Sequence, residues 1–466
     1  MVSLVWFRND LRIKDNPALL DASDHGTVHA CFIVSGEQWR QHKVGDRRIA
    51  FIGRAVNSLA KELASLGITL QLIDAANFSQ VPIALLTHAN NLGARRVVFN
   101  AEYPTNEVER DQAVTDVLQA NDIAVVRSHG GVTHPPGSVL TNKGAPYSVF
   151  TPFKKTWLKQ LQPDAIRPLA PPPPQDSSVH PVQVDHLAGV PVALGATDWP
   201  ASEADASRLL KTFTEGPIDH YAHTRNIPAL SSTSKLSAHL SIGTLSSNQC
   251  LHAALQKSPD ELADHHTRAW FEQIIWRDFY RHVVALFPHV SRGQAFRRQY
   301  NQIPWRQDPA SLEAWKNGRT GYPLVDAGMR QLRATGWMHN RLRMVTAMFL
   351  TKHLLIDWRE GEAYFMEQLV DGDFAANNGG WQWSASTGTD ATPYFRLFNP
   401  TTQGSRFDPQ GLFTKQWIPE LADVPAKHLF EPHKTPLNLA YPRPIVDHKR
   451  ARDRVITVFK SIRSNA

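Results

Sequence analysis

Five short apolar runs, each followed by a segment long enough for a helix, constrain the fold of the first part of the chain. The runs occupy residues 4–7, 28–34, 70–73, 97–99 and 123–126. Between the second and third runs, apolar residues recur with a helical period from Ile52 to Leu66. Parallel strands need long crossover connections, which helices supply. The alternation therefore predicts an α/β domain built on a doubly wound parallel sheet.

The first apolar run leads into the sequence RNDLR (8–12). It lacks the G-x-G-x-x-G turn that carries a pyrophosphate in Rossmann folds. The sequence therefore gives no support for a dinucleotide held in that manner by this domain. Ligands of open parallel sheets bind beyond the carboxyl ends of the strands, so any ligand of this domain is expected there.

The chain changes character after about residue 130. Residues 168–181 (PLAPPPPQDSSVHP) have the composition of a linker that runs extended over a surface. We therefore expect an α/β domain over residues 1–130, a linker over 131–200 and a mainly α-helical domain over 201–466. Helical spacing in the last part is clearest in residues 201–215, 247–256, 267–286, 324–334 and 337–355.

Charge and cysteine content limit the class of protein. Lys and Arg total 50 against 43 Asp and Glu, which gives a net charge of +7 and favours a polyanionic partner. Cys31 and Cys250 are far apart, which argues against a disulfide framework or a thiolate zinc site and fits a reducing cytoplasm. Charged residues follow Met1 closely and no run of eighteen apolar residues occurs. We expect a soluble, cytoplasmic protein that neither enters a membrane nor is secreted.

Two helical motifs combine aromatic and cationic side chains. In QIIWRDFYRH (273–282), Gln273, Trp276, Arg277 and Tyr280 share one helical face, which suits stacked bases and phosphates. The alternative is an amphipathic helix whose arginine reaches the solvent. In GWMHNRLRM (336–344), the corresponding residues are Trp337, Asn340, Arg341 and Met344, where Asn can pair with a base edge, although Met at this spacing is usually core filler.

The segment that begins Asp371-Gly-Asp373 and continues GGWQWSASTGTDATPYFRLFNP (379–400) mixes carboxylates, tryptophans and hydroxyls. Such residues need partners when buried, and a large polar and aromatic ligand such as a flavin would supply them. TSKLS (233–237) offers hydroxyls and a cation before a helix, which suits a diphosphate, and an ordinary helix cap is the alternative. The paired carboxylates could also bind a divalent metal, which we rank below hydrogen bonding to a ligand.

Together these motifs resemble those of the cryptochrome/photolyase family. The resemblance rests on RNDLR, YxxxR (221–225), TSKLS, WRDFYRH, TGWMHNRLRM, DGDxAxNNGGWQWxASTGTDA and YFRxFNPxxQ, and it spans nearly the whole chain. WMHNRLRM and NNGGWQW are most similar to bacterial class I photolyases that repair cyclobutane pyrimidine dimers. Three motifs of other enzyme classes, G-x-S-x-G, G-x-x-x-x-G-K-[ST] and H-E-x-x-H, do not occur in the sequence.

The resemblance implies an N-terminal antenna domain and a helical domain that holds FAD. Asn377 matches the residue beside flavin N5, where an amide adds no charge that would compete with the anionic reduced flavin used in repair. Asn106 and Glu107 match a folate-type antenna site, so methenyltetrahydrofolate is the antenna chromophore we expect. The matched flavin-binding positions are Tyr221, Thr233, Ser234, Lys235, Leu236, Ser237, Trp270, Asp371, Gly372 and Asp373.

The resemblance also implies a reaction. Light excites the reduced flavin, one electron passes to a flipped-out dimer, the cyclobutane ring opens and the electron returns. Trp381, Trp358 and Trp305 match the family's electron-transfer chain to the flavin. The positions matched to the lesion and the DNA are Arg225, Gln273, Trp276, Arg277, Tyr280, Asn340, Arg341, Met344, Trp383 and Gln403.

Three departures from the family pattern bear on specificity. Gln273 stands where dimer photolyases generally have Glu, and Gln there is more like the (6-4) branch, although Asn340 and Met344 favour the dimer branch. Lys235 replaces a common Arg and loses its bidentate capacity. Ser291-Arg292 replaces a Cys-Lys pair found near the folate in some relatives, which leaves the antenna open.

We therefore expect a monomeric, light-dependent lyase that acts on DNA carrying pyrimidine dimers. The alternatives are repair of (6-4) photoproducts and a cryptochrome-type blue-light photoreceptor. Photoreceptors of that type usually carry a long C-terminal extension, whereas this sequence ends soon after residue 455. A third alternative is a nucleic-acid binder without flavin.

Overall fold

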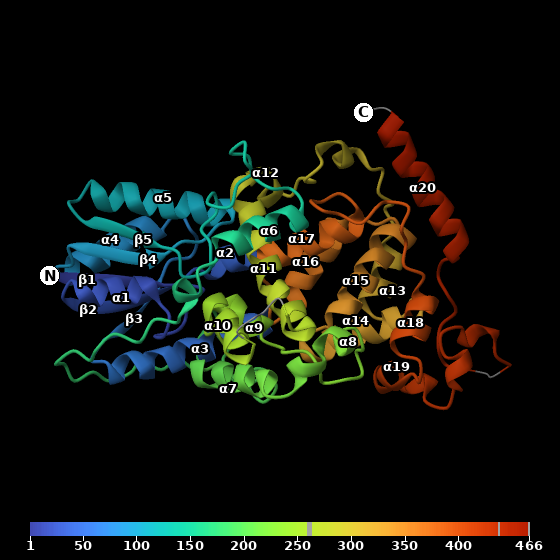
Figure 1. The fold of residues 1–466 in the computed structure, drawn as a ribbon, viewed down its shortest axis with the longest axis horizontal. Coiled ribbons are helices and arrows are strands. Elements are labelled where there is room, and N and C mark those ends of the chain that lie inside the picture. Colours follow the sequence, from blue (N-terminus) through green and yellow to red (C-terminus); the bar gives the residue numbers. More distant parts are fainter. Residues whose placement is uncertain (259–262, 437–438, 465–466) are drawn as a thin grey trace. The chain divides into compact units, whose positions relative to one another are not determined.

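The computed structural model describes residues 1–258, 263–436 and 439–464 (Figure 1). The chain forms two compact units and passes between them several times. Unit 1 comprises Met1–Asp219, Ser234–Ser291 and Val370–Ala375, and unit 2 comprises His220–Thr233, Arg292–Leu369 and Ala376–Ala466. Each unit is described in turn.

Unit 1 is built on a parallel sheet whose strands coincide with the predicted apolar runs. The strand order is β3-β2-β1-β4-β5, so β1 lies at the centre with Val5 paired to Ala30 on one side and to Val98 on the other. This is the order of a doubly wound sheet, and the predicted fold class is confirmed. The strands are β1 (Val2–Phe7), β2 (Thr27–Val34), β3 (Leu70–Asp74), β4 (Arg96–Asn100) and β5 (Ala124–Ser128).

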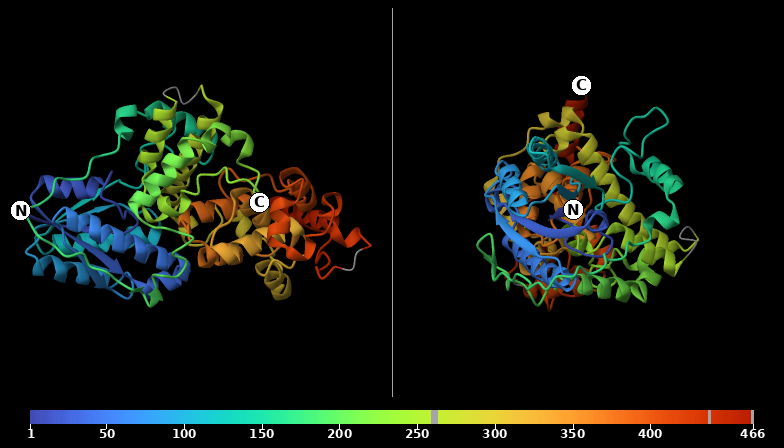
Figure 2. Two further views of the ribbon diagram at one scale, coloured as in Figure 1. Left: turned by 90° about the horizontal axis from the view of Figure 1, so that it is seen from below. Right: turned by 90° about the vertical axis from the view of Figure 1, so that its left-hand side faces the viewer.

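Both faces of this sheet are buried, which explains why its strands are continuously apolar. Along β1, Val5 and Phe7 belong to one core with α1 (Pro17–Asp24) and α3 (Asp46–Ser65). Leu4 and Trp6 belong to a second core with α4 (Val81–Asn91) and α5 (Thr105–Gln119). Since successive side chains of a strand point to opposite faces, two helical layers enclose the sheet (Figures 1 and 2).

Unit 1 also contains helices from the middle of the chain. Buried Asp278 ties them together: its carboxylate accepts hydrogen bonds from Trp157 Nε1 (3.1 Å) and from the Thr133 backbone N–H (3.1 Å). In the proline-rich segment, Gln175 bonds through its side chain to both backbone groups of Val28. The remaining α-helices of unit 1 are α2 (Gly36–Gln41), near the start of the chain, and α6 (Phe150–Gln160), α7 (Glu203–Thr214), α9 (Ser237–Ile242), α10 (Ser247–Lys257), α11 (His265–Leu286) and α12 (Pro288–Ser291).

Unit 2 is helical in its described residues. The predicted helical segment 337–355 is divided into an α-helix and a π-helical turn, η4. The α-helix begins at Asn340 because the ring of His339 accepts the Arg341 backbone N–H (3.1 Å). The π-helical turn is η4 (Phe349–His353), and α17 (Phe374–Ala385) has its first two residues in unit 1. The other α-helices are α8 (Tyr221–Thr224), α13 (Pro309–Lys316), α14 (Pro323–Thr335), α15 (Asn340–Met348), α16 (Trp358–Gln368), α18 (Pro400–Phe407), α19 (Leu412–Trp417) and α20 (His448–Ser464).

Two general expectations can be compared with the described residues. Among them, no helix has the length and apolar character that crossing a membrane requires. Cys31 and Cys250 are both buried and form no disulfide. Burial raises the pKa of each thiol, so both cysteines act as small apolar groups in the core.

The core of unit 2 encloses Trp381, a residue of α17. Its indole packs edge-on against Phe365, with ring centroids 4.9 Å apart, and against Trp315 at 6.0 Å. Gly361 lies directly against the indole of Trp381, so any Cβ at that position would overlap the ring. A glycine is thus required there by close approach.

We expect Gly361→Ala to destabilise the protein by about 1–3 kcal/mol, because the methyl group must displace a fully enclosed ring. Urea unfolding monitored by tryptophan fluorescence measures this change. Gly380→Ala is the matched control, since a Cβ at Gly380 meets no atom within 4 Å. Equal stability of the two variants would show that the core yields at Gly361.

Candidate functional site

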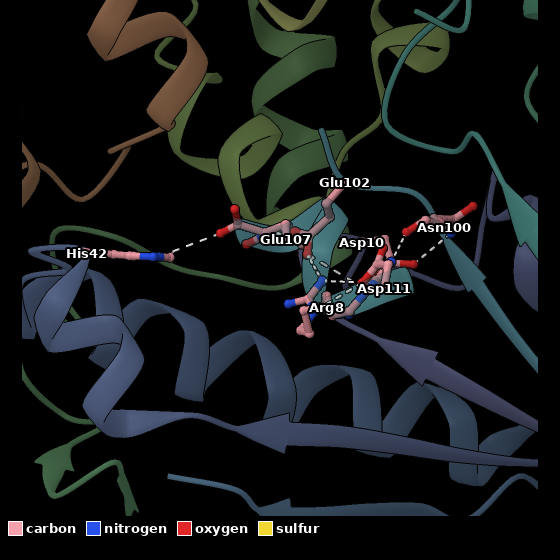
Figure 3. A network of polar contacts seen from close by, with 9 residues as sticks. Arg8, Asp10, His42, Asn100, Glu102, Glu107 and Asp111 are labelled. Atoms are coloured by element: carbon pink, nitrogen blue, oxygen red, sulfur yellow. Dashed lines mark hydrogen bonds and ion pairs between the residues drawn. The ribbon is translucent and has the colours of Figure 1, made fainter. Parts of the chain in front are cut away.

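The first candidate site lies where the winding of the sheet reverses, beyond the carboxyl ends of β1 and β4 (Figure 3). Arg8 and Asp10 follow β1, and Asn100 and Glu102 close and follow β4. Asp10 accepts a hydrogen bond from the Asn100 side chain (2.6 Å), which joins the two strand ends. The reversal point of the sheet therefore carries polar side chains, as the sheet topology predicts for a ligand site.

Beneath this site lies a buried network of paired charges. Arg8 bonds to Asp111 (2.8 Å), and Arg110 bonds to Glu102 (2.7 Å) and to Asp111 (2.7 Å). Burial alone would raise the pKa of Glu102, but the charges of Arg8 and Arg110 lower it to about 2. Glu102 is therefore an ionised carboxylate throughout the physiological range.

Glu107 and Asn106, both predicted antenna residues, lie at the edge of this network on the first turn of α5. Asn106 Nδ2 is 2.9 Å from His42 Nε2, and His42 Nδ1 is 3.6 Å from a Glu107 carboxylate oxygen. Burial, followed by the negative charge of Glu102, raises the pKa of Glu107 to about 7. Burial and then Arg110 lower the pKa of His42. These groups can both donate to and accept from a heteroaromatic ring with little net charge.

The predicted flavin residues are distributed over both units. In unit 1, Arg281 pairs with Asp373 at 3.1 Å, and Arg277 lies 3.8 Å from the same carboxylate. Arg48 on α3 donates to the Gly372 carbonyl, a contact that the motif did not indicate. The metal alternative gains no support, since no group of three or more His, Cys, Asp or Glu side chains in the described residues is placed for a metal ion.

The segment Thr233 to Ser237 leads into α9, which begins at Ser237, and its hydroxyls do not cap that helix. Leu236 occupies the N-cap position, and no side-chain cap is present within this described part of the chain. Lys235 has a left-handed backbone (φ 52°), which is a strained conformation for a residue with a side chain. The cap alternative is therefore not observed, and the hydroxyls of Ser234 and Ser237 are available to a ligand.

On α11, the predicted face is half-buried at all four expected positions. The Trp276 ring stacks on Phe150, with centroids 3.7 Å apart, and lies 5.5 Å from Tyr280. Gln273 folds back to donate to the Ala269 carbonyl (3.2 Å). Arg277 turns inward to the carbonyls of Leu240 and Gly131, so its contact with DNA stays a prediction. Trp270, a predicted flavin residue, is buried against Phe213.

Unit 2 brings together a cluster of like charges that the sequence indicated only in part. Arg341 donates to Asn226 (2.8 Å), and its guanidinium lies 4.5 Å from the centroid of Phe407. Burial, then the charges of Arg225 and Arg406, lowers the pKa of Arg341. Positive charges that repel one another beside aromatic rings suit a polyanion with stacked bases.

The other predicted lesion residues of unit 2 differ in exposure. Asn340 is exposed, and Met344 and Trp383 are half-buried. Gln403 is also half-buried, and its side-chain oxygen is enclosed without a hydrogen-bond partner among the described residues. Arg225 lies 5.8 Å from the ring centroid of Tyr221, a predicted flavin residue.

The three predicted electron-transfer tryptophans all pack in one core of unit 2. Trp358 and Trp381 are fully enclosed, whereas Trp305 is half-buried at the margin of this core. Trp305 would therefore be the surface end of the predicted electron-transfer chain. Asn377 donates from its amide nitrogen to the Glu362 carbonyl (3.0 Å), which leaves its oxygen to accept from a ligand. An acceptor at Asn377, available hydroxyls and carboxylates beside guanidinium groups fit the donors, acceptors and diphosphate of FAD.

Comparison with known proteins shows the family of the chain. The family described as "DNA photolyase" matches residues 3–175, and the family described as "FAD binding domain of DNA photolyase" matches residues 270–461. The deoxyribodipyrimidine photo-lyase of Salmonella typhimurium is 44% identical, and the alignment covers 99% of each chain.

Two solved structures are similar over nearly the whole chain. A class III photolyase from Agrobacterium tumefaciens has a TM-score of 0.87 and 34% identity, and the match covers 99% of this chain and 98% of that one. A cryptochrome from Synechocystis has a TM-score of 0.85 and 26% identity, with 98% and 99% covered.

The pKa of Glu107 makes a prediction about stability. The pKa of Glu107 is about 7 in the folded protein and 4.5 in the unfolded chain. The contribution of Glu107 to the free energy of unfolding is therefore fully present below about pH 4.5 and is lost as pH rises through 7. Gln cannot ionise, and we expect Glu107→Gln to be more stable than the original protein by about 1–3 kcal/mol at about pH 8.5, with no gain at about pH 4. Urea unfolding at both pH values measures the difference. The exposed Glu109→Gln is the control, and equal pH dependence of both variants would contradict the assignment.

Proposed function

Because this chain belongs to the DNA photolyase family, we propose that it splits cyclobutane pyrimidine dimers in DNA in a light-dependent reaction, the activity of a deoxyribodipyrimidine photo-lyase. The structural observation that carries the proposal is the cluster of Arg225, Arg341 and Arg406 beside aromatic rings. Its mutual repulsion is relieved when phosphates bind. We also propose that the protein acts as a monomer and that it meets its DNA in the cytoplasm.

The chain carries the FAD-binding domain of its family, and the residues proposed to hold FAD fall into three chemical groups. The hydroxyls of residues 233–237 suit a diphosphate, the carboxylates of Asp371 and Asp373 accept from hydroxyl and N–H groups, and Asn377 accepts through its oxygen. The flavin, when bound, supplies the light-driven electron that opens the dimer. Trp381, Trp358 and Trp305 are proposed to re-reduce it. Tyr221, Leu236, Trp270 and Gly372 complete the proposed site.

Residues of both units are proposed to contact the DNA. Arg225 and Arg341 bind phosphates, and Asn340 and Gln403 offer hydrogen bonds to base edges. Trp276, Met344 and Trp383 supply apolar and aromatic surface for a dimer taken out of the stack. A dimer pairs and stacks poorly, so its extrusion costs less free energy than that of an intact base. Gln273, Arg277 and Tyr280 are the remaining proposed contacts.

The antenna site is proposed to hold methenyltetrahydrofolate at Asn106 and Glu107. A pterin ring presents N–H donors beside carbonyl and ring-nitrogen acceptors. Glu107, which titrates near neutral pH, and His42 beside it can serve both kinds of group. Arg110 and Glu102 hold the charge beneath the site in fixed pairs.

A cryptochrome-type photoreceptor is the second candidate, and the similarity to the Synechocystis structure favours it. Both candidates share FAD and the tryptophan chain. They differ in catalysis, because a photoreceptor binds flavin without turning over a DNA lesion.

The test is a reduced, illuminated reaction on oligonucleotides that carry either a thymine cyclobutane dimer or a (6-4) product, with a dark control. We expect loss of the cyclobutane dimer in light only. No repair of either lesion by protein that still holds FAD would favour the photoreceptor. Repair of the (6-4) product alone would move the assignment to that branch.

A Gln273→Glu variant in the same assay addresses lesion choice. The added carboxylate restores the residue usual in dimer photolyases, so affinity or yield for the cyclobutane dimer should rise. An unchanged affinity and yield would remove Gln273 from the account of specificity.

A further inference from the structure

Lys352 is a buried cation that the proposed reaction does not use. It lies on η4 with no exposed surface, and so do its four neighbours in that turn. Its ammonium group donates one hydrogen bond within the described residues, to the Arg396 carbonyl at 3.1 Å. Removing an ammonium group from water is costly unless it is paired, so a residue with this placement calls for an explanation.

Within the described residues, no carboxylate is placed in contact with Lys352. Burial, followed by the positive charge of Arg396, lowers the pKa of Lys352 to about 7. On its own turn lies His353, whose Nε2 is 2.8 Å from Nδ1 of His448 on α20. Arg454, also on α20, donates to the His353 carbonyl. The pKa of His353 is lowered to about 3 and that of His448 is lowered also, both chiefly by burial.

Lys352 holds a segment that is fixed on both sides and exposed in the middle. Tyr394 stacks in parallel on Phe459 of α20, with ring centroids 5.6 Å apart. Phe398 lies 5.9 Å from the Arg341 guanidinium. Between these anchors, Phe395 is 56% exposed and Arg396 is also exposed.

An aromatic ring and a guanidinium side by side at the surface can stack on a base and bind a phosphate. The segment is linked through Phe398 to Arg341, one of the proposed phosphate contacts. We propose that Lys352 is a positioning residue for damaged DNA: by holding the Arg396 carbonyl, it fixes Phe395 and Arg396 in the orientation that contacts the substrate. This inference rests on the proposed function and deepens it.

The charge of Lys352 couples this contact to pH. A phosphate bound at Arg396 offsets the positive charge that now disfavours protonated Lys352, so DNA binding raises the pKa of the lysine above its free value. The complex then holds more protons than the free protein. Affinity for dimer-containing DNA is therefore highest below about pH 7 and decreases as pH rises through the range between the free and bound pKa values.

The experiment compares Lys352→Met with the original protein on a duplex that carries one thymine dimer. Dissociation constants are measured in the dark between about pH 6 and pH 9, and the repair yield per bound complex is measured in light. We expect binding to weaken about tenfold at about pH 6.5, the pH dependence between pH 7 and 9 to flatten, and the yield per bound complex to be unchanged. Lys449→Met is the matched control, because it removes the same charge from an exposed position on α20 and should keep the original pH profile.

A second variant separates positioning from folding. If Lys352 acts through the segment it holds, Phe395→Ala alone weakens binding, and adding Lys352→Met to it causes little further loss. FAD content and melting temperature report whether each variant is folded. Should Lys352→Met not fold, unchanged affinity of Phe395→Ala overturns the inference.

The inference is also overturned if Lys352→Met folds and keeps the affinity and the pH profile of the original protein. If the unaltered protein neither binds nor repairs the dimer, the proposed function fails instead.

Discussion

The structure depends on how buried positive charge is balanced. In unit 1, Arg8 and Arg110 are paired with Glu102 and Asp111, and Arg48 donates to a backbone carbonyl. These contacts hold the ends of the strands and the acidic segment in fixed positions. In unit 2, the charges that act on Arg341 are those of two further arginines. Paired charge maintains the fold, whereas the repelling cluster is proposed to gain free energy when DNA supplies phosphates.

The sequence predicted the sheet because both of its faces are buried. Such strands are short, continuously apolar runs, and all five observed strands overlap the expected ones. The division into two units has no comparable signal in the sequence. Asp278 bonds to Trp157, 121 residues away, and contacts at that separation leave no local pattern. The π-helical turn after Met348 was equally invisible, since helical spacing of apolar residues continues through it.

The candidate site was accessible to sequence reasoning where its residues lie in continuous motifs. Asn106 and Glu107 lie beyond the carboxyl ends of the strands, where a ligand was expected. The four predicted positions of α11 share a half-buried face. His42, Arg48 and Arg406 were missed because each comes from a separate part of the chain. Arg277 shows the limit of reasoning from motifs. It lies on the helical face that was predicted to contact DNA, but its guanidinium bonds to backbone carbonyls inside the protein.

The central claim is that the cluster of Arg225, Arg341 and Arg406 binds the phosphates of dimer-containing DNA. Binding of dimer-containing and undamaged duplexes over a range of salt concentrations tests it most directly. The account predicts that log affinity falls linearly with log salt, with a slope of about −3 or steeper, and that the dimer-containing duplex binds more tightly at every salt concentration. A flat salt response with equal affinity for both duplexes would contradict it.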